Sequence, residues 1–221
     1  MTATQLQDTK VADLTTGNTT ETQNAAPIDL SDGKMKILRA VTTLLEDSAN
    51  KITVNRIANH IAVTEAALYR HYRSKEEIFA ALLAYTESHF MVPLFKAQQQ
   101  TGRPLESRFF DIFESYMTFL EQHPGLSRLL LGQANTEAAG VSEKVMLLHG
   151  KMRSQLALLV KRAWAEDRPM TNPYTPDQVA DVFYSMVTSA ALASTMDLPQ
   201  LPWDVRWEAF KTAIFRTGSH A

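Results

Sequence analysis

The sequence predicts an all-α protein in which an N-terminal three-helix unit precedes a longer helical region, with about nine helices in total. Two observations carry this prediction. From residue 32 onward, apolar residues recur three or four positions apart, the spacing that gives a helix one buried side, and no segment keeps the alternation of a half-buried strand. In addition, prolines and N-capping residues lie between the periodic segments, where helices begin and end.

The first 30 residues differ from the rest of the chain. They are rich in Thr, Gln, Asn and Asp and contain few large apolar side chains, so burial could not offset the entropy lost on ordering them. Residues 1–30 are therefore predicted to form a flexible tail.

Three short helices are predicted next, over residues 34–47, 53–61 and 64 to about 71. Thr53 and Thr64 open the second and third of them with hydroxyls that can accept a backbone hydrogen bond. A fourth helix follows Ser74, with Glu77 three positions later. This is the spacing of a capping box, in which each side chain binds the backbone N–H of the other residue.

Proline marks the boundaries of the next helices. Pro93 is expected to kink or end the fourth helix, and Pro104 to lie in the first turn of a fifth helix that ends near Gln122. A corner is expected at residues 123–125, before a short helix over residues 126–131.

The last part of the chain predicts three further helices. Residues 142–166 form one long periodic segment. The next helix opens with Thr175, Pro176 and Gln178, which supply an N-cap, a first-turn proline and the reciprocal partner of a capping box. The final helix is expected over residues 203–215.

Composition excludes most enzyme classes and a membrane protein. The chain contains no cysteine, its six histidines lack the spacing of metal ligands, and it has neither a Gly-x-Ser-x-Gly sequence nor a glycine-rich phosphate loop. No catalytic, metal or cofactor site is therefore predicted. The sequence also offers no apolar run of about 20 residues and no secretory signal, so the reducing cytoplasm is the expected location.

Charge is distributed unevenly along the chain. The net charge is −2 overall, but residues 34–75 hold eight basic and three acidic side chains, a local excess of 8 − 3 = +5. Such an asymmetry is expected where one region meets the phosphates of a nucleic acid while the rest avoids non-specific binding. Chance clustering on a solvated surface is the alternative.

The second and third predicted helices are separated only by Ala62 and Val63, the short connection of a helix-turn-helix. One side of the third helix is thereby left exposed. A major groove about 12 Å wide accepts a helix whose leading side chains are small. Threonine can bond a base edge or a phosphate, and tyrosine and basic side chains can hold phosphates. The predicted DNA-binding residues are Thr53, Arg56, Thr64, Ala66, Ala67, Tyr69, Arg70, His71 and Lys75.

Three stretches resemble the DNA-binding domain of TetR-family regulators: ITVNRIA at residues 52–58, VTEAALYRHY at residues 63–72 and SKEEIF at residues 74–79. The resemblance covers about residues 34–80. It is specific because the order of small residues, the tyrosines and the following Ser-Lys pair are hard to obtain together by chance.

This resemblance implies a helix-turn-helix DNA-binding domain at residues 31–75 and a helical dimerisation and regulatory domain at residues 76–221. It also implies a homodimer in which the last two helices of each chain form a four-helix bundle. Where the family usually has glycine in the turn, this chain has Ala62. If that backbone is left-handed, alanine costs about 1 kcal/mol relative to glycine.

The second half is similar, more narrowly, to the nucleoid occlusion branch of the same family. The similar stretches are HPGLSRLL at residues 123–130, YTPD at residues 174–177 and WDVRW at residues 203–207. The resemblance implies that such proteins, bound to chromosomal sites, restrain the division protein FtsZ by holding its tail between the fourth and fifth helices. In place of the arginines of that groove, this chain has Pro93 and Gln122, which provide no charged anchor for an acidic tail. FtsZ is therefore only the alternative partner, and a repressor without FtsZ is the main expectation.

A wide apolar stripe on the next-to-last helix predicts a dimer interface. A stripe of this width needs partners on two sides and, with apolar residues of the last helix, indicates an isologous contact between two copies. A core within one chain is the alternative. The predicted interface residues are Val182, Phe183, Met186, Ala190, Trp207, Phe210 and Ile214.

Aromatic and methionine side chains at helical spacing in the second half indicate an ordinary core. Alternatively, they line a pocket for a small apolar effector, because methionine and aromatic surfaces adapt to such ligands. The residues of that alternative pocket are Tyr85, Phe113, Tyr116, Met117 and Met152.

The sequence thus predicts a cytoplasmic, nucleoid-associated homodimer without enzymatic activity that binds double-stranded DNA and represses transcription. Two copies of the third helix are expected in successive major grooves, about 34 Å apart. A nucleoid occlusion factor that inhibits FtsZ assembly is the alternative function.

Overall fold

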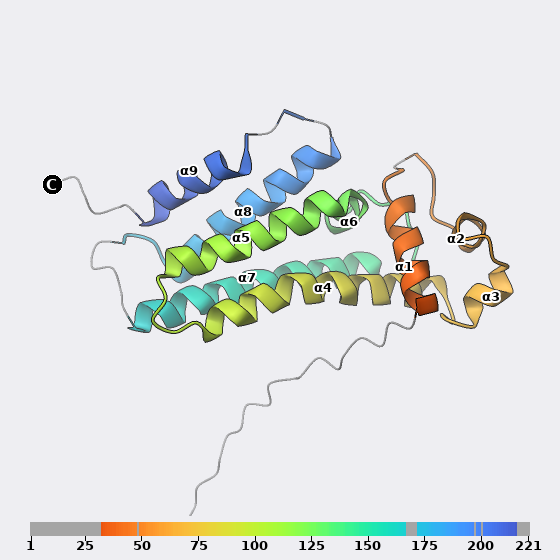
Figure 1. The fold of residues 1–221 in the computed structure, drawn as a ribbon, viewed down its shortest axis with the longest axis horizontal. Coiled ribbons are helices and arrows are strands. Elements are labelled where there is room, and N and C mark those ends of the chain that lie inside the picture. Colours follow the sequence, from red (N-terminus) through yellow and green to blue (C-terminus); the bar gives the residue numbers. More distant parts are fainter. Residues whose placement is uncertain (1–31, 48, 167–171, 197, 200, 216–221) are drawn as a thin grey trace, which may run out of the picture.

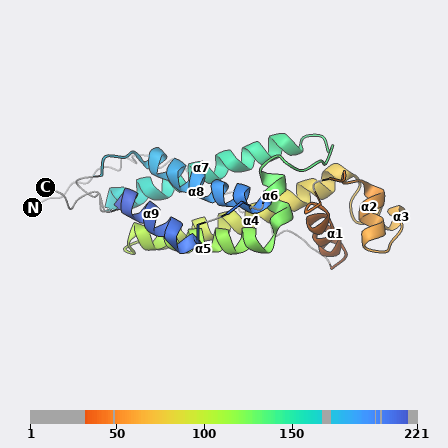
Figure 2. The same ribbon diagram turned by 90° about the horizontal axis from the view of Figure 1, so that it is seen from above.

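The computed structural model describes residues 32–47, 49–166, 172–196, 198–199 and 201–215 (Figure 1). Nine helices and no strand are found among these residues, which confirms the predicted all-α class for the described chain. The predicted tail at residues 1–30 lies outside them. Three short helices gather at one end of an elongated helical body, an arrangement that Figures 1 and 2 show from two directions.

The end of the molecule consists of α1 (Asp32–Leu44), α2 (Val54–His60) and α3 (Glu65–Tyr69), which we call the reader unit. The threonine caps are present as predicted. The Thr53 hydroxyl accepts a hydrogen bond from the N–H of Arg56 at 3.2 Å, and that of Thr64 accepts one from Ala67 at 3.1 Å. α3 is shorter than the predicted helix because it ends at Tyr69, before His71.

The predicted capping box at the start of the fourth helix is half correct. The Ser74 hydroxyl accepts the N–H of Glu77 at 3.2 Å, as expected. The Glu77 carboxylate, however, accepts from the N–H of Arg73, at 2.6 Å, one residue before the expected partner. At the eighth helix both bonds between Thr175 and Gln178 form as predicted.

α4 (Lys75–Gln99) continues through Pro93. The sequence predicted that Pro93 would either kink or end this helix, and the structure shows that it does not end it. Contacts beyond the proline hold the helix together, because Leu94 and Ala97 are fully buried. α4 is long and apolar enough to cross a membrane by length and composition alone. Here it packs against α1, α5 and α7, so it is a core helix of the body.

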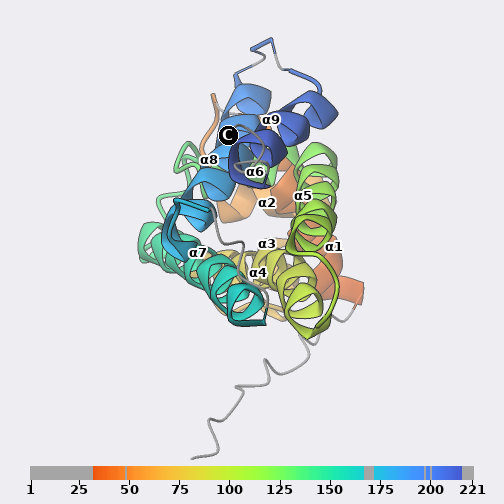
Figure 3. The same cartoon turned by 90° about the vertical axis from the view of Figure 1, so that its left-hand side faces the viewer.

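The remaining helices of the body are α5 (Leu105–Gln122), α6 (Pro124–Leu130), α7 (Val141–Glu166), α8 (Pro176–Thr195) and α9 (Trp203–Phe215). Their order agrees with the prediction. The corner expected at residues 123–125 is confined to His123, because α6 already begins at Pro124, two residues earlier than predicted. Figure 3 looks along the body, with α4 and α7 on one side and α8 and α9 on the other. α7 packs against both α4 and α8, and α5 packs against α4, α8 and α9.

Aromatic side chains fill the core between α5, α8 and α9. The ring of Phe183 lies 4.8 Å from that of Phe109 and 5.5 Å from that of Phe210, measured between centroids, and Trp207 lies 5.2 Å from Phe110. Edge-on contacts of this kind stabilise a packed core beyond the area that they bury. This cluster fixes α8 and α9 to the rest of the chain.

Gly125 joins the reader unit to the body at the contact between α1 and α6. A Cβ at this position would lie 2.1 Å from the backbone oxygen of Thr42, well inside any permitted contact. Only glycine therefore lets the two helices approach this closely. This joint and α4 connect the two regions, since α4 also packs against α1.

Candidate nucleic-acid interface

The turn between α2 and α3 has the left-handed backbone that its position requires. Ala62 has a φ of +55°, and the N–H of Val63 returns to the carbonyl of Ala58 at 3.0 Å. The structure thereby confirms the condition under which alanine in place of glycine costs about 1 kcal/mol. The tight turn sets the angle at which α3 leaves the reader unit.

α3 buries a single side chain, Leu68, and turns its other residues outward. Thr64, Ala66 and Arg70 are exposed, Tyr69 is 45% exposed, and Ala67 is half-buried. The predicted face is therefore brought together at the tip of the molecule. Small side chains at the start of the helix leave its backbone accessible, while the tyrosine and the arginine stand at its end.

Two of the predicted cations are bound within the protein. The Arg56 guanidinium forms an ion pair with Asp47 and donates to the carbonyl of Asn50 at 3.0 Å. The pKa of Asp47 is lowered, first by the Asn50 amide that donates to it and also by Arg56. The Lys75 ammonium donates to the carbonyl of Thr136, at 2.7 Å, in the loop between α6 and α7.

His71 is exposed and lies against the start of α1. A Cβ on Gly33 would meet the His71 ring at 2.4 Å, so the two residues are in close contact. Thr53 is exposed beside the same end of the molecule. The Asn55 amide donates a hydrogen bond to the Glu65 carboxylate at 3.0 Å, which connects α2 to α3 and was not predicted. A pair of exposed polar residues ten positions apart carries no sequence signal of contact.

Five of the seven predicted dimer residues are buried inside the single chain, which corrects their assignment. Phe183, Ala190, Trp207, Phe210 and Ile214 have exposed fractions of 6% or less. They pack in the aromatic core, the alternative considered for this stripe. Val182 is exposed and Met186 half-buried.

A different apolar surface lies on the outer side of α8 and α9. Val182, Leu192 and Met196 are 44%, 40% and 56% exposed, and Val205 of α9 is 47% exposed. Exposed Ser185 and Ser189 lie between the apolar positions of α8. We call the group Val182, Ser185, Ser189, Leu192, Met196 and Val205 the outer α8–α9 face.

The five residues of the alternative effector pocket belong to the core. Phe113 and Tyr116 are fully buried, Met117 and Met152 are nearly so, and Tyr85 is partly buried. Tyr116 donates its hydroxyl to the carbonyl of Phe90 at 2.8 Å, and burial raises its pKa well above the ordinary value. These side chains pack against their neighbours, and two surface grooves are lined by other residues. One lies between α4 and α7, the other between α5 and α9.

Within the described ranges, no three His, Asp or Glu side chains come close enough together to hold a metal ion. The arrangement at the reader unit is instead one of exposed small, hydroxyl and basic groups on a capped helix. Such a surface can contact a polyanion.

Comparison with known proteins agrees with this geometry. Residues 37–82 match the family described as bacterial regulatory proteins, tetR family. The nucleoid occlusion factor SlmA of Vibrio atlanticus (strain LGP32) is 30% identical over 134 residues, which cover 59% of this chain and 68% of that protein.

Solved structures resemble the whole fold at low identity. A Clostridium perfringens putative fatty acid metabolism regulator has a TM-score of 0.66 and 15% identity, covering 84% of this chain and all of that one. AibR in complex with isovaleryl coenzyme A and operator DNA has a TM-score of 0.64 and 17% identity, covering 84% of this chain and 99% of that one.

Proposed function

Because the chain belongs to the tetR family of bacterial regulatory proteins, we propose that it binds specific double-stranded DNA sites as a homodimer and represses transcription. The observation that carries this proposal is the exposed side of α3, where small residues precede a tyrosine and an arginine at the tip of the molecule. In this proposal the protein acts by binding DNA and not as an enzyme. It is located in the cytoplasm, associated with the nucleoid.

In this proposal, the exposed residues of the α3 face have specific roles in DNA binding. Ala66 lets the helix backbone approach base edges, and its methyl group can touch a thymine methyl. Thr64 contacts a base edge or phosphate while its hydroxyl caps the helix, and Tyr69 and Arg70 hold the DNA backbone. Arg56 and Lys75 support the reader unit through their bonds within the protein.

Dimerisation is proposed through the outer α8–α9 face. Apolar side chains interrupted by serines allow two such helices to pack closely, and an isologous contact uses the same surface on both copies. A two-fold dimer places two copies of α3 at sites about 34 Å apart, one helical turn of DNA. The bound site is then expected to be a near-palindrome.

A gel-shift comparison tests the DNA-binding face. Tyr69→Ala is expected to weaken site binding at least tenfold with no change in thermal unfolding, because the side chain is 45% exposed. Lys161→Ala, an exposed change on α7, is the matched control and should leave binding unchanged. Equal loss in both variants would contradict the assignment of the face.

Thr64 needs a second comparison because it also caps α3. Thr64→Ala removes the cap, which costs about 1 kcal/mol, together with any DNA contact. Thr64→Ser keeps a hydroxyl at the cap and removes only the methyl group. If Thr64→Ser preserves stability but weakens binding to particular base sequences, the methyl group contacts a base.

Nucleoid occlusion is the second candidate function. The likeness to SlmA extends over 134 residues, well beyond the 46 residues, 37–82, that match the family model. Pro93 and Gln122 do not offer an acidic FtsZ tail any cationic partner. Co-sedimentation with FtsZ polymers in the presence of bound DNA tests this candidate. Mapping of bound chromosomal sites separates the two functions, since many dispersed sites favour occlusion and a few promoter sites favour local repression.

A further inference from the structure

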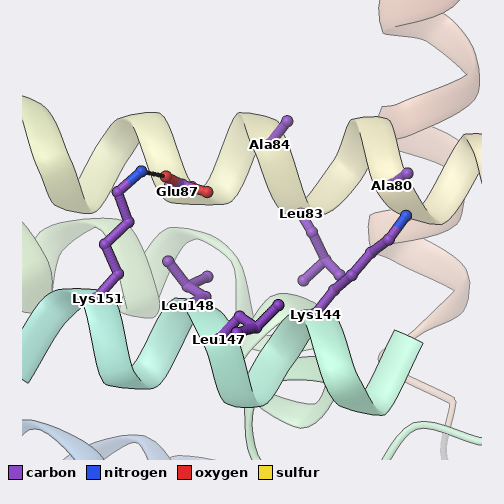
Figure 4. A pocket seen from close by; sticks show the side chains of 8 residues that line it. All are labelled: Ala80, Leu83, Ala84, Glu87, Lys144, Leu147, Leu148 and Lys151. Carbon is purple, nitrogen blue, oxygen red and sulfur yellow. Dashed lines mark hydrogen bonds and ion pairs between the residues drawn. The ribbon is translucent and has the colours of Figure 1, made fainter. Parts of the chain in front are cut away.

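A surface groove of about 330 Å³ runs between α4 and α7 (Figure 4). Its floor consists of Leu83 and Leu148, which are only 4% and 3% exposed. Small side chains on α4, Ala80 and Ala84, leave the trough open, and Leu147 of α7 stands at its edge with 73% of its surface exposed. The groove therefore presents an apolar trough to solvent.

Lysines stand at the two ends of this trough. Lys151 forms an ion pair with Glu87 across the groove, so its charge is neutralised there. Lys144, at the other end, forms no ion pair with any residue that the structure describes. The groove thus combines one uncompensated cation with an apolar surface.

We propose that this groove binds a free, single-headed anionic amphiphile, a carboxylate with an unbranched acyl chain. The carboxylate pairs with Lys144, and the chain lies on Leu83, Leu147 and Leu148 toward Lys151. The lysines are seven residues apart on one helix, which is about 10 Å, the length of a chain of about eight to ten carbons. At the far end of the groove, the Lys151 charge is already neutralised by Glu87. A ligand with a second anionic group at that end would be repelled by the Glu87 carboxylate, so the groove favours a ligand with one anionic group.

The two helices that line the groove, α4 and α7, lie on the side of the body away from α9 (Figure 3). A dimer formed through the outer α8–α9 face therefore leaves the groove open. The five residues of the alternative effector pocket offer no comparable space, because they are packed in the core.

Residues 135–137, which we call the strap, connect the groove to the reader unit. The N–H of Ile52 donates to the carbonyl of Asn135 at 3.1 Å, Lys75 binds the carbonyl of Thr136, and Lys51 forms an ion pair with Glu137. α7 begins only four residues after Glu137, and Lys144 lies in its first turn. A chain seated between α4 and α7 separates the ends of the two helices that the strap joins. Bound amphiphile therefore weakens DNA binding, a consequence that rests on the proposed function.

Calorimetric titration of the full-length chain with decanoate, below its micelle concentration, tests the site without DNA. We expect one decanoate per chain. Affinity should rise two- to fourfold per methylene up to about ten carbons and then level off, because further carbons leave the groove. Decanol and decyltrimethylammonium, which have the same chain without the negative charge, should bind at least fivefold more weakly.

Two variants and two matched controls locate the site. Lys144→Gln and Leu147→Ser should each weaken decanoate binding at least fivefold. Lys161→Gln and Met146→Ser change exposed residues of the same helix outside the groove and should bind as the unchanged protein does. Equal binding by all four variants, equal binding of the quaternary ammonium compound, or heat release only with micelles would overturn the proposal.

A DNA-binding measurement with decanoate tests the connection through the strap. Decanoate should lower the DNA affinity of the unchanged protein severalfold and leave that of Lys144→Gln unaltered. Decanoate that binds without changing DNA affinity would refute the connection, although the site would stand. Absence of DNA binding before any decanoate is added would instead count against the proposed function.

Discussion

Helices α3 and α8 both turn one side to solvent, but they are held in place differently. α3 has five residues, one of which, Leu68, is buried, and its position depends on the Thr64 cap and the turn at Ala62. α8 has 20 residues and seven buried side chains, with Phe183 at the centre of the aromatic core. Local bonds therefore place the first helix, and packing against distant segments places the second.

This difference explains why the sequence predicted the exposed side of α3 correctly but did not distinguish the inner side of α8 from its outer side. In a helix of five residues whose one large aliphatic side chain is Leu68, the buried side follows from that residue, while the Tyr69 ring stays 45% exposed. α8 is apolar on two sides, and periodicity alone does not tell which of them meets the chain's own core. The predicted interface residues consequently fell largely on the inner side of α8 and α9.

The largest expected effect separates the two sides of α8. Phe183→Ala should lower the free energy of unfolding by about 3–5 kcal/mol, because it leaves a cavity among buried rings. Val182→Ala, at the neighbouring exposed position, should change it by less than about 0.5 kcal/mol. Urea unfolding followed by circular dichroism measures both. Similar losses in the two variants would show that the sides of α8 are not as distinct as described.

The next effect concerns the dimer. Val182→Glu combined with Leu192→Glu places like charges on both copies of the outer α8–α9 face and should weaken dimerisation about 100-fold or more. Helix content should remain unchanged, because both positions are exposed. Sedimentation velocity over a range of concentrations measures the change, and Met146→Glu on α7 is the control. A dimer that survives the double change must use another surface.

A smaller effect is expected from one charge on the reader unit. Arg70→Gln should reduce DNA affinity severalfold for all sequences alike. It should also lower the slope of log affinity against log salt concentration by about one per chain, because one phosphate contact is lost. Lys161→Gln should leave the slope unaltered. An unchanged slope in Arg70→Gln would mean that this side chain does not touch the DNA backbone.

The smallest effect at neutral pH involves Tyr72, a buried residue three positions after the end of α3. Burial, with a contribution from Glu77, raises the pKa of Tyr72 to about 12. An unfolded tyrosine ionises near pH 10, so the folded state loses stability as the pH rises from about 10 to about 12, by roughly 2–3 kcal/mol. Tyr72→Phe should remove this part of the alkaline loss.

At pH 7 the same variant should unfold with nearly unchanged free energy. The Tyr72 hydroxyl is buried without a hydrogen-bond partner among the described residues, so its removal breaks no bond. Urea titrations at pH 7 and pH 11 measure both outcomes. The buried Tyr116 still contributes to alkaline loss in either protein. A large destabilisation at pH 7 would indicate a bond from the Tyr72 hydroxyl to a group outside the described residues.

The sequence by itself determined the features that depend on neighbours in the chain. These are the helical class, the caps at Thr53, Thr64 and Thr175, the last helix and the exposed side of α3. Each follows from hydrogen bonds within one turn or from periodicity along one segment, so the residues that decide it are adjacent in sequence.

The tertiary structure decided what depends on residues far apart. Phe183 and Phe210 are buried in the core, and Lys75 donates a hydrogen bond to the strap. Gly125 lies in close contact with the backbone of Thr42. None of these contacts can be recognised from the periodicity of the sequence, because the two partners are tens of residues apart in the chain and meet only when the helices pack. Burial and charge pairing between distant segments, unlike helix formation, are properties of the assembled core.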